Sequence, residues 1–193
     1  MFPNLKCDIR RYKNIRGGGL GFKDSLYLIF EQGVWAIVAY RFGRWVHSLR
    51  IPIVRMILKV IAFILFKITE ILTGISLPAS AQIGKGLYIG HFGGIIVHSL
   101  SKIGKNCSIG SGVVIGTRGL GNKGVPIIGD NVYIGVGAKV LGGIKIGNNV
   151  RIGANAVVLK DIPDNSTVVG IPAKIIKINN LKLKEVYKDV CIS

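Results

Sequence analysis

The feature that most restricts the fold of this chain is an aliphatic residue that recurs every six positions from residue 83 onward. Glycine usually follows this residue, and a small or medium side chain stands four places after it. A fixed period of this kind is typical of a solenoid. The recurring positions are Ile83, Ile89 and Ile95, then Ile103, Ile109 and Ile115, and then Ile128, Ile134, Val140, Ile146, Ile152 and Val158.

A six-residue period predicts a parallel β-helix in which each unit forms one flat face of a triangular coil. Three units complete a coil, so each aliphatic side chain stacks on its counterpart in the next coil. A buried Ile or Val contributes about 1.5–3 kcal/mol, and the chain's 27 glycines permit tight corners. We therefore predict a β-helix domain over residues 75–175.

Two interruptions of the six-residue spacing mark candidate binding segments. The first adds two residues near His98, and the second ejects residues 117–126 as a glycine-rich loop with two basic side chains. Solenoids often carry binding loops at such insertions. We predict that this loop is a lid or a phosphate contact, and a solvated loop is the alternative. Its basic residues are Arg118 and Lys123.

The residues before the repeats have a helical pattern. We predict an α-helical N-terminal region over residues 1–74, and we assign no role to the tail at 176–193. The longest uninterrupted apolar run in the helix at 53–72 is Val60 to Phe66, well short of the ~18 residues of a membrane-spanning helix. This helix either packs against the rest of the protein or lies in a membrane surface, because it is apolar almost all round and basic where it is polar.

Charge and cysteine content restrict the partners and the compartment. The net charge of +17 favours anionic partners, but no basic helix with spaced aromatic residues supports nucleic-acid binding. Three widely spaced cysteines, Cys7, Cys107 and Cys191, match neither a metal pattern nor a disulfide framework. Because the first residues also lack the apolar stretch of a signal peptide, we predict a reduced cytoplasmic protein without a metal.

Four stretches resemble the serine acetyltransferase family of hexapeptide-repeat acyltransferases, and together they span nearly everything from Asp8 to Lys174. The resemblance implies helices followed by a left-handed parallel β-helix, acetyl-CoA as co-substrate, and a homotrimer with active sites between subunits. The stretches are CDIRRY at 7–12, AYRFGRW at 39–45, IGKGLYIGHFGGIIV at 83–97 and the block from 128 to 174 that ends in VVGIPAK.

The chain also departs from the family pattern. Gly90 replaces an aspartate before the family's histidine, Ser76 replaces a carboxylate, and Gly124 and Val125 replace an Arg-His pair. These differences favour the branch that O-acetylates sugars in capsular or exopolysaccharide biosynthesis, some of them attached to a lipid. We therefore expect a saccharide acceptor and peripheral contact with the inner face of the membrane.

The resemblance places the general base at His91. A hydroxyl is a weak nucleophile at neutral pH, and histidine has a pKa suited to removing its proton. The acceptor is expected at Phe92, Gly93, His98 and Ser76. The positions that match the family's coenzyme A groove are Gly116, Thr117, Gly135, Val136, Gly153 and Ala154, with Lys160 and Lys174 near the phosphates.

Two other functions stay open, and a third is excluded. One is serine O-acetyltransferase activity in cysteine biosynthesis. The other is a basic membrane-associated β-helix scaffold without catalysis, although such a scaffold would have no need of the HFGG segment. A β-helix carbonic anhydrase needs three histidines on one zinc; this chain has three in all, and His47 lies in the helical region.

Overall fold

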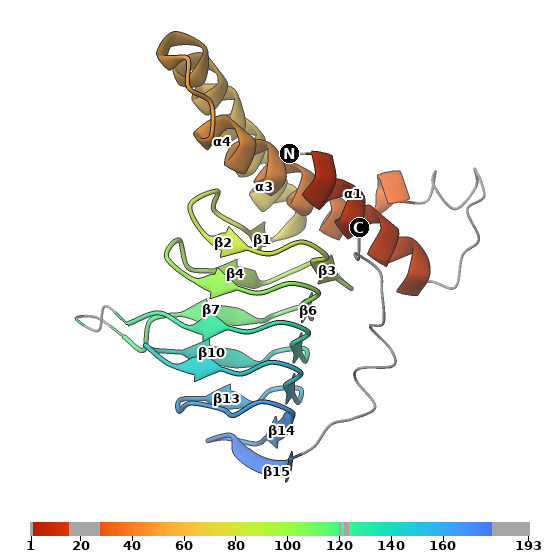
Figure 1. The fold of residues 1–193 in the computed structure, drawn as a ribbon, viewed down its shortest axis with the longest axis vertical. Helices are drawn as coiled ribbons and strands as arrows, with labels where there is room; N and C mark the ends of the chain where they lie inside the picture. Colours follow the sequence, from red (N-terminus) through yellow and green to blue (C-terminus); the bar gives the residue numbers. More distant parts are fainter. Residues whose placement is uncertain (1, 16–27, 120, 122–123, 179–193) are drawn as a thin grey trace.

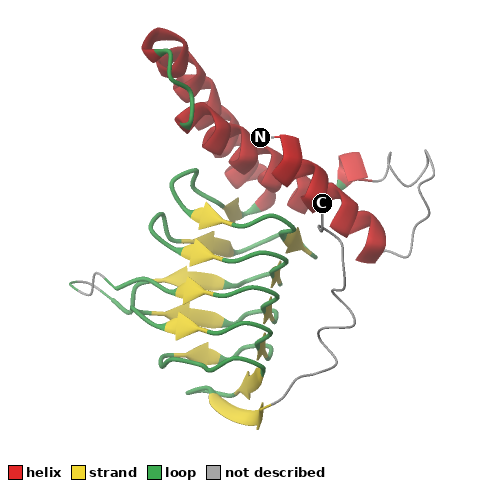
Figure 2. Cartoon of the chain, viewed as in Figure 1, coloured by secondary structure: helices red, strands yellow, loops and turns green. Residues whose placement is uncertain are grey.

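In the computed structural model, helices lie across one end of a triangular β-helix (Figures 1 and 2). The structure describes residues 2–15, 28–119, 121 and 124–178. No helix in these ranges has both the length and the apolar character needed to cross a bilayer. The helical elements are α1 (Phe2–Ile15), the short 3-10 helix η1 (Leu28–Phe30), α3 (Gln32–His47) and α4 (Pro52–Thr73).

Short parallel strands stack into three sheets, one for each face of the triangle. Sheet A contains β1 (Ile75–Ser76), β4 (Ile95–Val97), β7 (Val114–Gly116), β10 (Lys139–Leu141) and β13 (Val157–Val158). Sheet B contains β2 (Gln82–Ile83), β5 (Lys102–Ile103), β8 (Ile127–Ile128) and β11 (Lys145–Ile146). Sheet C contains β3 (Tyr88–Ile89), β6 (Ser108–Ile109), β9 (Tyr133–Ile134), β12 (Arg151–Ile152), β14 (Ser166–Val169) and the antiparallel β15 (Lys174–Ile178).

The core follows the six-residue repeat, except between β3 and β4. There Val97, and not Ile95, is level with Ile115, so the first interruption lies between Ile89 and Val97 and its expected place near His98 is wrong. On sheet C, Ile89 pairs with Ile109, Ile109 with Ile134, and Ile134 with Ile152, and all four side chains are at most 1% exposed. The small residue four places on is buried as well, as at Cys107. The predicted mainly β fold with hexapeptide repeats and N-terminal helices is therefore confirmed.

Asparagine shapes one row of corners together with glycine. Asn106, Asn131, Asn149 and Asn165 have φ angles of 55° to 59°, and asparagine tolerates this left-handed region better than most residues. Successive side chains also bond along the row: the Asn149 amide donates to Asn165 Oδ1 at 2.9 Å. Side chains as well as glycines therefore form the corners.

Two tyrosines from the helices cover the open strand edges of the first coil. The Tyr12 hydroxyl donates to the Ile89 carbonyl at 2.9 Å and accepts from the Ile89 N–H at 3.0 Å. The Tyr40 hydroxyl donates to the Ala81 carbonyl at 2.9 Å and accepts from the Ile83 N–H at 3.0 Å. Exposed strand edges are prone to pairing with other chains, so these contacts close that end of the solenoid.

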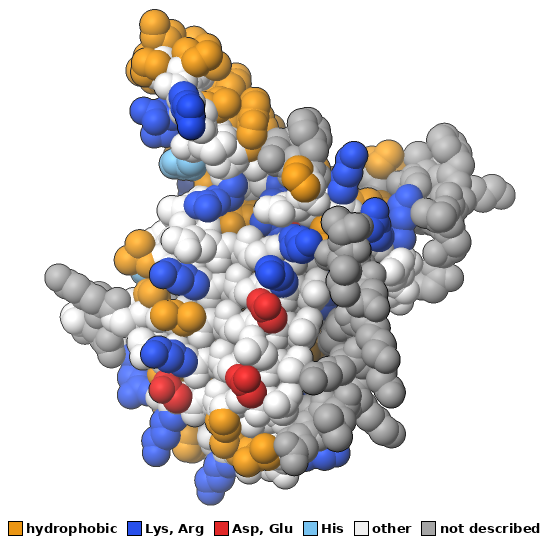
Figure 3. Space-filling model, in the orientation of Figure 1, with side chains coloured by type: hydrophobic (Ala, Val, Ile, Leu, Met, Phe, Trp, Pro, Cys, Tyr) orange, Lys and Arg blue, Asp and Glu red, His pale blue; other side chains and the backbone are white. Residues whose placement is uncertain are grey.

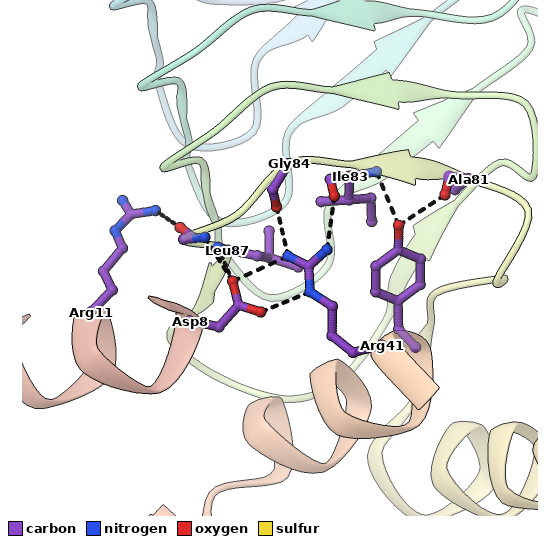
Figure 4. Close-up of polar contacts among 9 residues, drawn as sticks. Asp8, Arg11, Arg41, Ala81, Ile83, Gly84 and Leu87 are labelled. Atoms are coloured by element: carbon purple, nitrogen blue, oxygen red, sulfur yellow. Dashed lines mark hydrogen bonds and ion pairs between the residues drawn. The ribbon is translucent and has the colours of Figure 1, made fainter. Parts of the chain in front are cut away.

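A buried ion pair joins α1, α3 and the first coil (Figure 4). Arg41 donates to Asp8 at 2.8 and 3.1 Å, and Asp8 Oδ1 also accepts the N–H groups of Gly86 at 2.7 Å and Leu87 at 2.8 Å. The remaining guanidinium nitrogen donates to the Ile83 carbonyl at 2.8 Å. The resembling segments at 7–12 and 39–45 therefore meet at this cap.

Helix α4 packs against α3 on one side only. It ends at Thr73 and is followed by Gly74, whose φ of 64° is the left-handed conformation common after helices. Its opposite face is exposed; Ile53, Ile57 and Ile71 are 69%, 55% and 80% exposed. The apolar helix predicted at 53–72 is thus only half covered by its own chain, and its contact with a membrane stays a prediction.

Two details differ from the sequence-based expectations. Cys7 is disulfide-bonded, so the expectation of three reduced cysteines is wrong there; a disulfide depends on approach in space, which spacing along the chain does not reveal. Cys107 is a free, buried thiol. Strand β15 also continues to Ile178, beyond the expected domain end at 175, because it pairs with β14.

Candidate active site

His91 stands at the corner between β3 and β4 with an exposed side chain. The segment after it is fixed by close stacking: the Gly93 N–H donates to the Thr73 carbonyl at 2.9 Å, and the Gly93 carbonyl accepts the Gly112 N–H at 2.8 Å. Gly94 has a φ of 65°, and a Cβ there would lie 3.3 Å from the Gly112 Cα. The end of α4 on one side and the next coil on the other therefore set the backbone of the HFGG segment.

His91 lies at the same corner of the β-helix as several predicted cofactor positions. The Gly93 carbonyl accepts the Gly112 N–H, just as the Ser111 carbonyl accepts the Gly137 N–H and the Val136 carbonyl accepts the Asn155 N–H. Gly93, Ser111, Val136 and Ala154 therefore occupy equivalent places, and His91 and Phe92 bulge out of this row as an insertion of two residues. We call this corner the His91 corner. It consists of residues 90–93, Gly110 and Ser111, Gly135 and Val136, and Gly153 and Ala154.

The glycines of the His91 corner have a packing reason of their own. A Cβ on Gly135 would lie 2.7 Å from the Ala154 nitrogen, and one on Gly153 would lie 2.7 Å from Val169 Cγ1. A real Cβ essentially never comes this close to another heavy atom, so a side chain at Gly135 would displace the backbone of the next coil, and one at Gly153 would displace Val169. Because stacking explains these glycines, their identity alone does not indicate a cofactor.

The other predicted positions lie along a second corner, after the strands of sheet A. His98 is level with Gly116, and Gly116 is level with Leu141; Thr117 and Lys160 follow this row, which we call the His98 corner. His98 Nδ1 accepts the Leu100 N–H at 3.2 Å, so its ring is held by its own turn. The His91 and His98 corners are at opposite ends of β4, and one chain does not bring them together.

The remaining predicted residues are spread around these corners. Phe92 is 56% exposed beside His91. Ser76 lies on β1 opposite Ile96, and its hydroxyl hydrogen-bonds to Glu70; the bond from Lys67, together with that from Ser76, lowers the pKa of the Glu70 carboxyl. Lys174 begins β15, at the far end of the β-helix from His91 (Figure 1).

No carboxylate within the described ranges bonds to the His91 ring. Asp8 uses both carboxylate oxygens for Arg41 and the first coil. The described part of the chain also contains no cluster of three or more His, Cys, Asp or Glu residues suited to a metal.

The ejected loop joins β7 to β8 at the His98 corner. Arg118 donates to the Leu159 carbonyl and lies 3.7 Å from the place of a Cβ on Gly142. Its guanidinium is therefore bound along the coil. Lys123, the other basic residue of the predicted lid, lies outside the described residues.

Comparison with known proteins assigns the repeats to transferases. The family described as "Bacterial transferase hexapeptide (six repeats)" matches residues 126–160, and "Hexapeptide repeat of succinyl-transferase" matches residues 102–122. The serine acetyltransferase of Staphylococcus xylosus is 38% identical over 174 residues, which is 86% of this chain and 81% of that protein. The Synechococcus elongatus enzyme of the same name is 38% identical over 150 residues, or 77% of this chain.

Solved structures agree with this assignment. Serine acetyltransferase from Brucella abortus strain S19 in complex with coenzyme A has a TM-score of 0.76 and 31% sequence identity, over 91% of this chain and 67% of that one. This match supports left-handed coiling of the β-helix. The chain spans only 59% of the Synechococcus protein, so the activity, substrates and partners of this chain remain proposals.

The comparisons overturn the expected place in polysaccharide biosynthesis. That expectation gave weight to Ser76, Gly90, Val125 and the apolar helix, but similarity to serine acetyltransferases extends over most of the chain. A few altered positions count for less than identity of this extent. The prediction of an acetyl-CoA-dependent acyltransferase is confirmed at the level of the family. The chain belongs to the serine acetyltransferase family of hexapeptide-repeat acyltransferases.

Proposed function

We propose that the protein transfers the acetyl group of acetyl-CoA to the hydroxyl of serine, with His91 as general base. The observation that carries the proposal is the exposed imidazole at the head of the His91 corner, in a chain 38% identical to serine acetyltransferase over 174 residues. Cytoplasmic location and membrane contact stay predictions beside it.

During the reaction His91 takes up one proton and later gives one back. A neutral His91 ring takes the hydroxyl proton while the serine oxygen attacks the thioester carbonyl, and a tetrahedral oxyanion forms. When the intermediate collapses, the carbon–sulfur bond breaks and the imidazolium returns the proton to the leaving thiolate. The products are O-acetylserine and coenzyme A, and the ring is neutral again.

Coenzyme A would lie along corner residues, with its thioester at His91. Val136, which is 46% exposed on the His91 corner, and the exposed Ala154 beside it support this placement, with Thr117 half-buried on the His98 corner, and the exposed Lys160 offers a cation for a phosphate. Because these corners are at opposite ends of β4, we propose a homotrimer in which two subunits contribute to each site.

The acceptor contacts must differ from those of most family members. Gly90, Ser76 and Val125 replace the residues that the family uses around its amino-acid substrate. Phe92 and Gly93, which adjoin His91, are the nearest residues in sequence available for contact. We therefore propose that serine binds against the HFGG segment and that its KM is high.

Product identification tests this proposal. The full chain is incubated with acetyl-CoA and serine, thiol release is followed, and acetylated products are identified by mass spectrometry. Nucleotide sugars and oligosaccharides are tested in parallel. O-acetylserine formation above the rate of acetyl-CoA hydrolysis is the expected result. Turnover with none of these acceptors, or with saccharides alone, would refute serine as the substrate.

A further inference from the structure

A cavity lined by no residue of the His91 corner lies where the helices meet the first coil. It has a volume of about 410 Å³ and lies between α3, α4 and residues 77–80. This volume is within the range of small-molecule sites, which are mostly apolar with a few polar groups. Its apolar lining includes Val46, Ala62, Phe63, Phe66 and Leu77.

Small residues on the facing helices create this space. Ala39 and Gly43 on α3 and Ala62 on α4 line it. A Cβ on Gly43 would lie 2.8 Å from the Ala79 Cβ, so the first coil approaches α3 closely there. Phe63 and Phe66 belong to the same lining. The cavity therefore combines aromatic side chains with room left by small ones.

Cations gather on one side of the cavity. His47 and Lys59 are part of the lining, which contains no Asp or Glu. Burial, together with the charges of Lys59, Arg44 and Arg55, lowers the pKa of His47, so three positive charges act on its ring. An acidic ligand group would offset these charges.

The surroundings favour a long apolar ligand. Helices α3 and α4 together project from the β-helix as a helical arm (Figure 1). Figure 3 shows apolar side chains over the projecting end of this arm, with Lys and Arg side chains beside them. On α4, Phe63 both lines the cavity and is 61% exposed, so it joins the cavity to the apolar outer surface of the arm. An aliphatic chain could pass from that surface into the cavity.

We propose that this cavity binds the aliphatic chain of an anionic amphiphile, a fatty acid or an acyl phospholipid, and that Lys59 and His47 hold its acid group. Both ligands offer the same chemistry, an apolar chain that ends in a carboxylate or phosphate. The site is independent of serine acetylation.

Calorimetric titration of the full chain with dodecanoate tests the proposal. We expect saturable binding, at least tenfold weaker in Ala62→Trp because the new ring fills the cavity. Ile61→Trp is the matched control, since Ile61 is 42% exposed and does not line the cavity. Lys59→Gln should weaken binding by up to about fivefold, whereas Lys67→Gln on the same helix should not.

Further measurements distinguish a phospholipid from a free fatty acid as the ligand and define the results that overturn the site. Co-sedimentation with phosphatidylglycerol vesicles that falls in Ala62→Trp supports a phospholipid chain as ligand, and binding of dodecanoate alone supports a free fatty acid. Unchanged dodecanoate affinity in Ala62→Trp, or no saturable binding by protein that shows a cooperative thermal transition, overturns the site. Vesicle binding unaffected by Ala62→Trp, in protein that shows no saturable dodecanoate binding, would overturn it too and move the contact to the outer face of α4.

Discussion

Asp8 and Arg41 form an ion pair whose side chains are 0% and 3% exposed. Burial raises the pKa of the Asp8 carboxyl, while Arg41 and the Leu87 and Gly86 N–H groups act in the opposite direction. Desolvation offsets much of the attraction in such a pair, so its main effect is to fix geometry. Here it fixes α1 and α3 on the first coil. One of its contacts there, Leu87, is four residues before His91.

Replacing Asp8 by Ala should destabilise the protein by about 3–5 kcal/mol, because the Arg41 charge would stay buried without its partner. Urea unfolding measures the loss. Lys67→Gln is the control: Lys67 pairs with Glu70 at 2.7 Å, but its side chain is 49% exposed, and surface pairs contribute about 0–1 kcal/mol. Equal effects of the two substitutions would contradict the structural role of the Asp8–Arg41 pair.

At the scale of the elements, the main question is how the open strand edges of the first coil obtain hydrogen-bond partners. Within the described ranges no strand pairs with the outer edges of β2 and β3, and Tyr12 and Tyr40 supply the hydrogen bonds that such a strand would make to Ile89 and Ile83. Burial raises the pKa of the Tyr40 hydroxyl, so it stays protonated and can donate and accept at the same time.

Tyr40→Phe should cost about 1–3 kcal/mol of unfolding free energy, since the buried Ala81 carbonyl and Ile83 N–H lose their partner. Differential scanning calorimetry would show the lower transition temperature. Tyr133→Phe, on an outer position of β9, should change stability by less than about 0.5 kcal/mol. A Tyr40→Phe protein as stable as wild type would show that water replaces the hydroxyl.

The repeat predicted the strands because inward positions of a β-helix must be aliphatic, as at Ile109 and Ile134. The caps could not be predicted in the same way: Tyr12 and Arg41 have ordinary helical neighbours, and only the packing of α1 and α3 on the first coil reveals their partners. For the candidate site, the motif pointed to His91, whose role stays a proposal, and its separation from Gly116 depends on strand register, which the motif does not give.

At the scale of the whole molecule, one chain holds two halves of a proposed site. His91 stands at one corner of the triangle, and Gly116, Thr117 and Lys160 stand at another. A closed ring of identical subunits could bring the first corner of one copy to the second corner of the next. The net charge of +17 would attract an anionic cofactor to such a cleft.

Mixed trimers test this arrangement. His91→Asn and Thr117→Trp chains should each be strongly impaired, yet trimers reassembled from equal amounts of both should regain roughly a quarter of the wild-type sites, because random neighbours supply two intact corners at that frequency. Mass photometry verifies the trimers. Activity no greater than the sum of the two variants would place each site within one subunit.

Serine-dependent release of coenzyme A by wild type and His91→Asn tests the central claim most directly. The substitution should lower kcat by about 10²–10⁴-fold, the range for loss of a general base, while acetyl-CoA affinity and the unfolding midpoint stay close to wild type. If His91→Asn keeps kcat within about tenfold of the wild-type value, His91 is not the general base and the proposed mechanism is wrong.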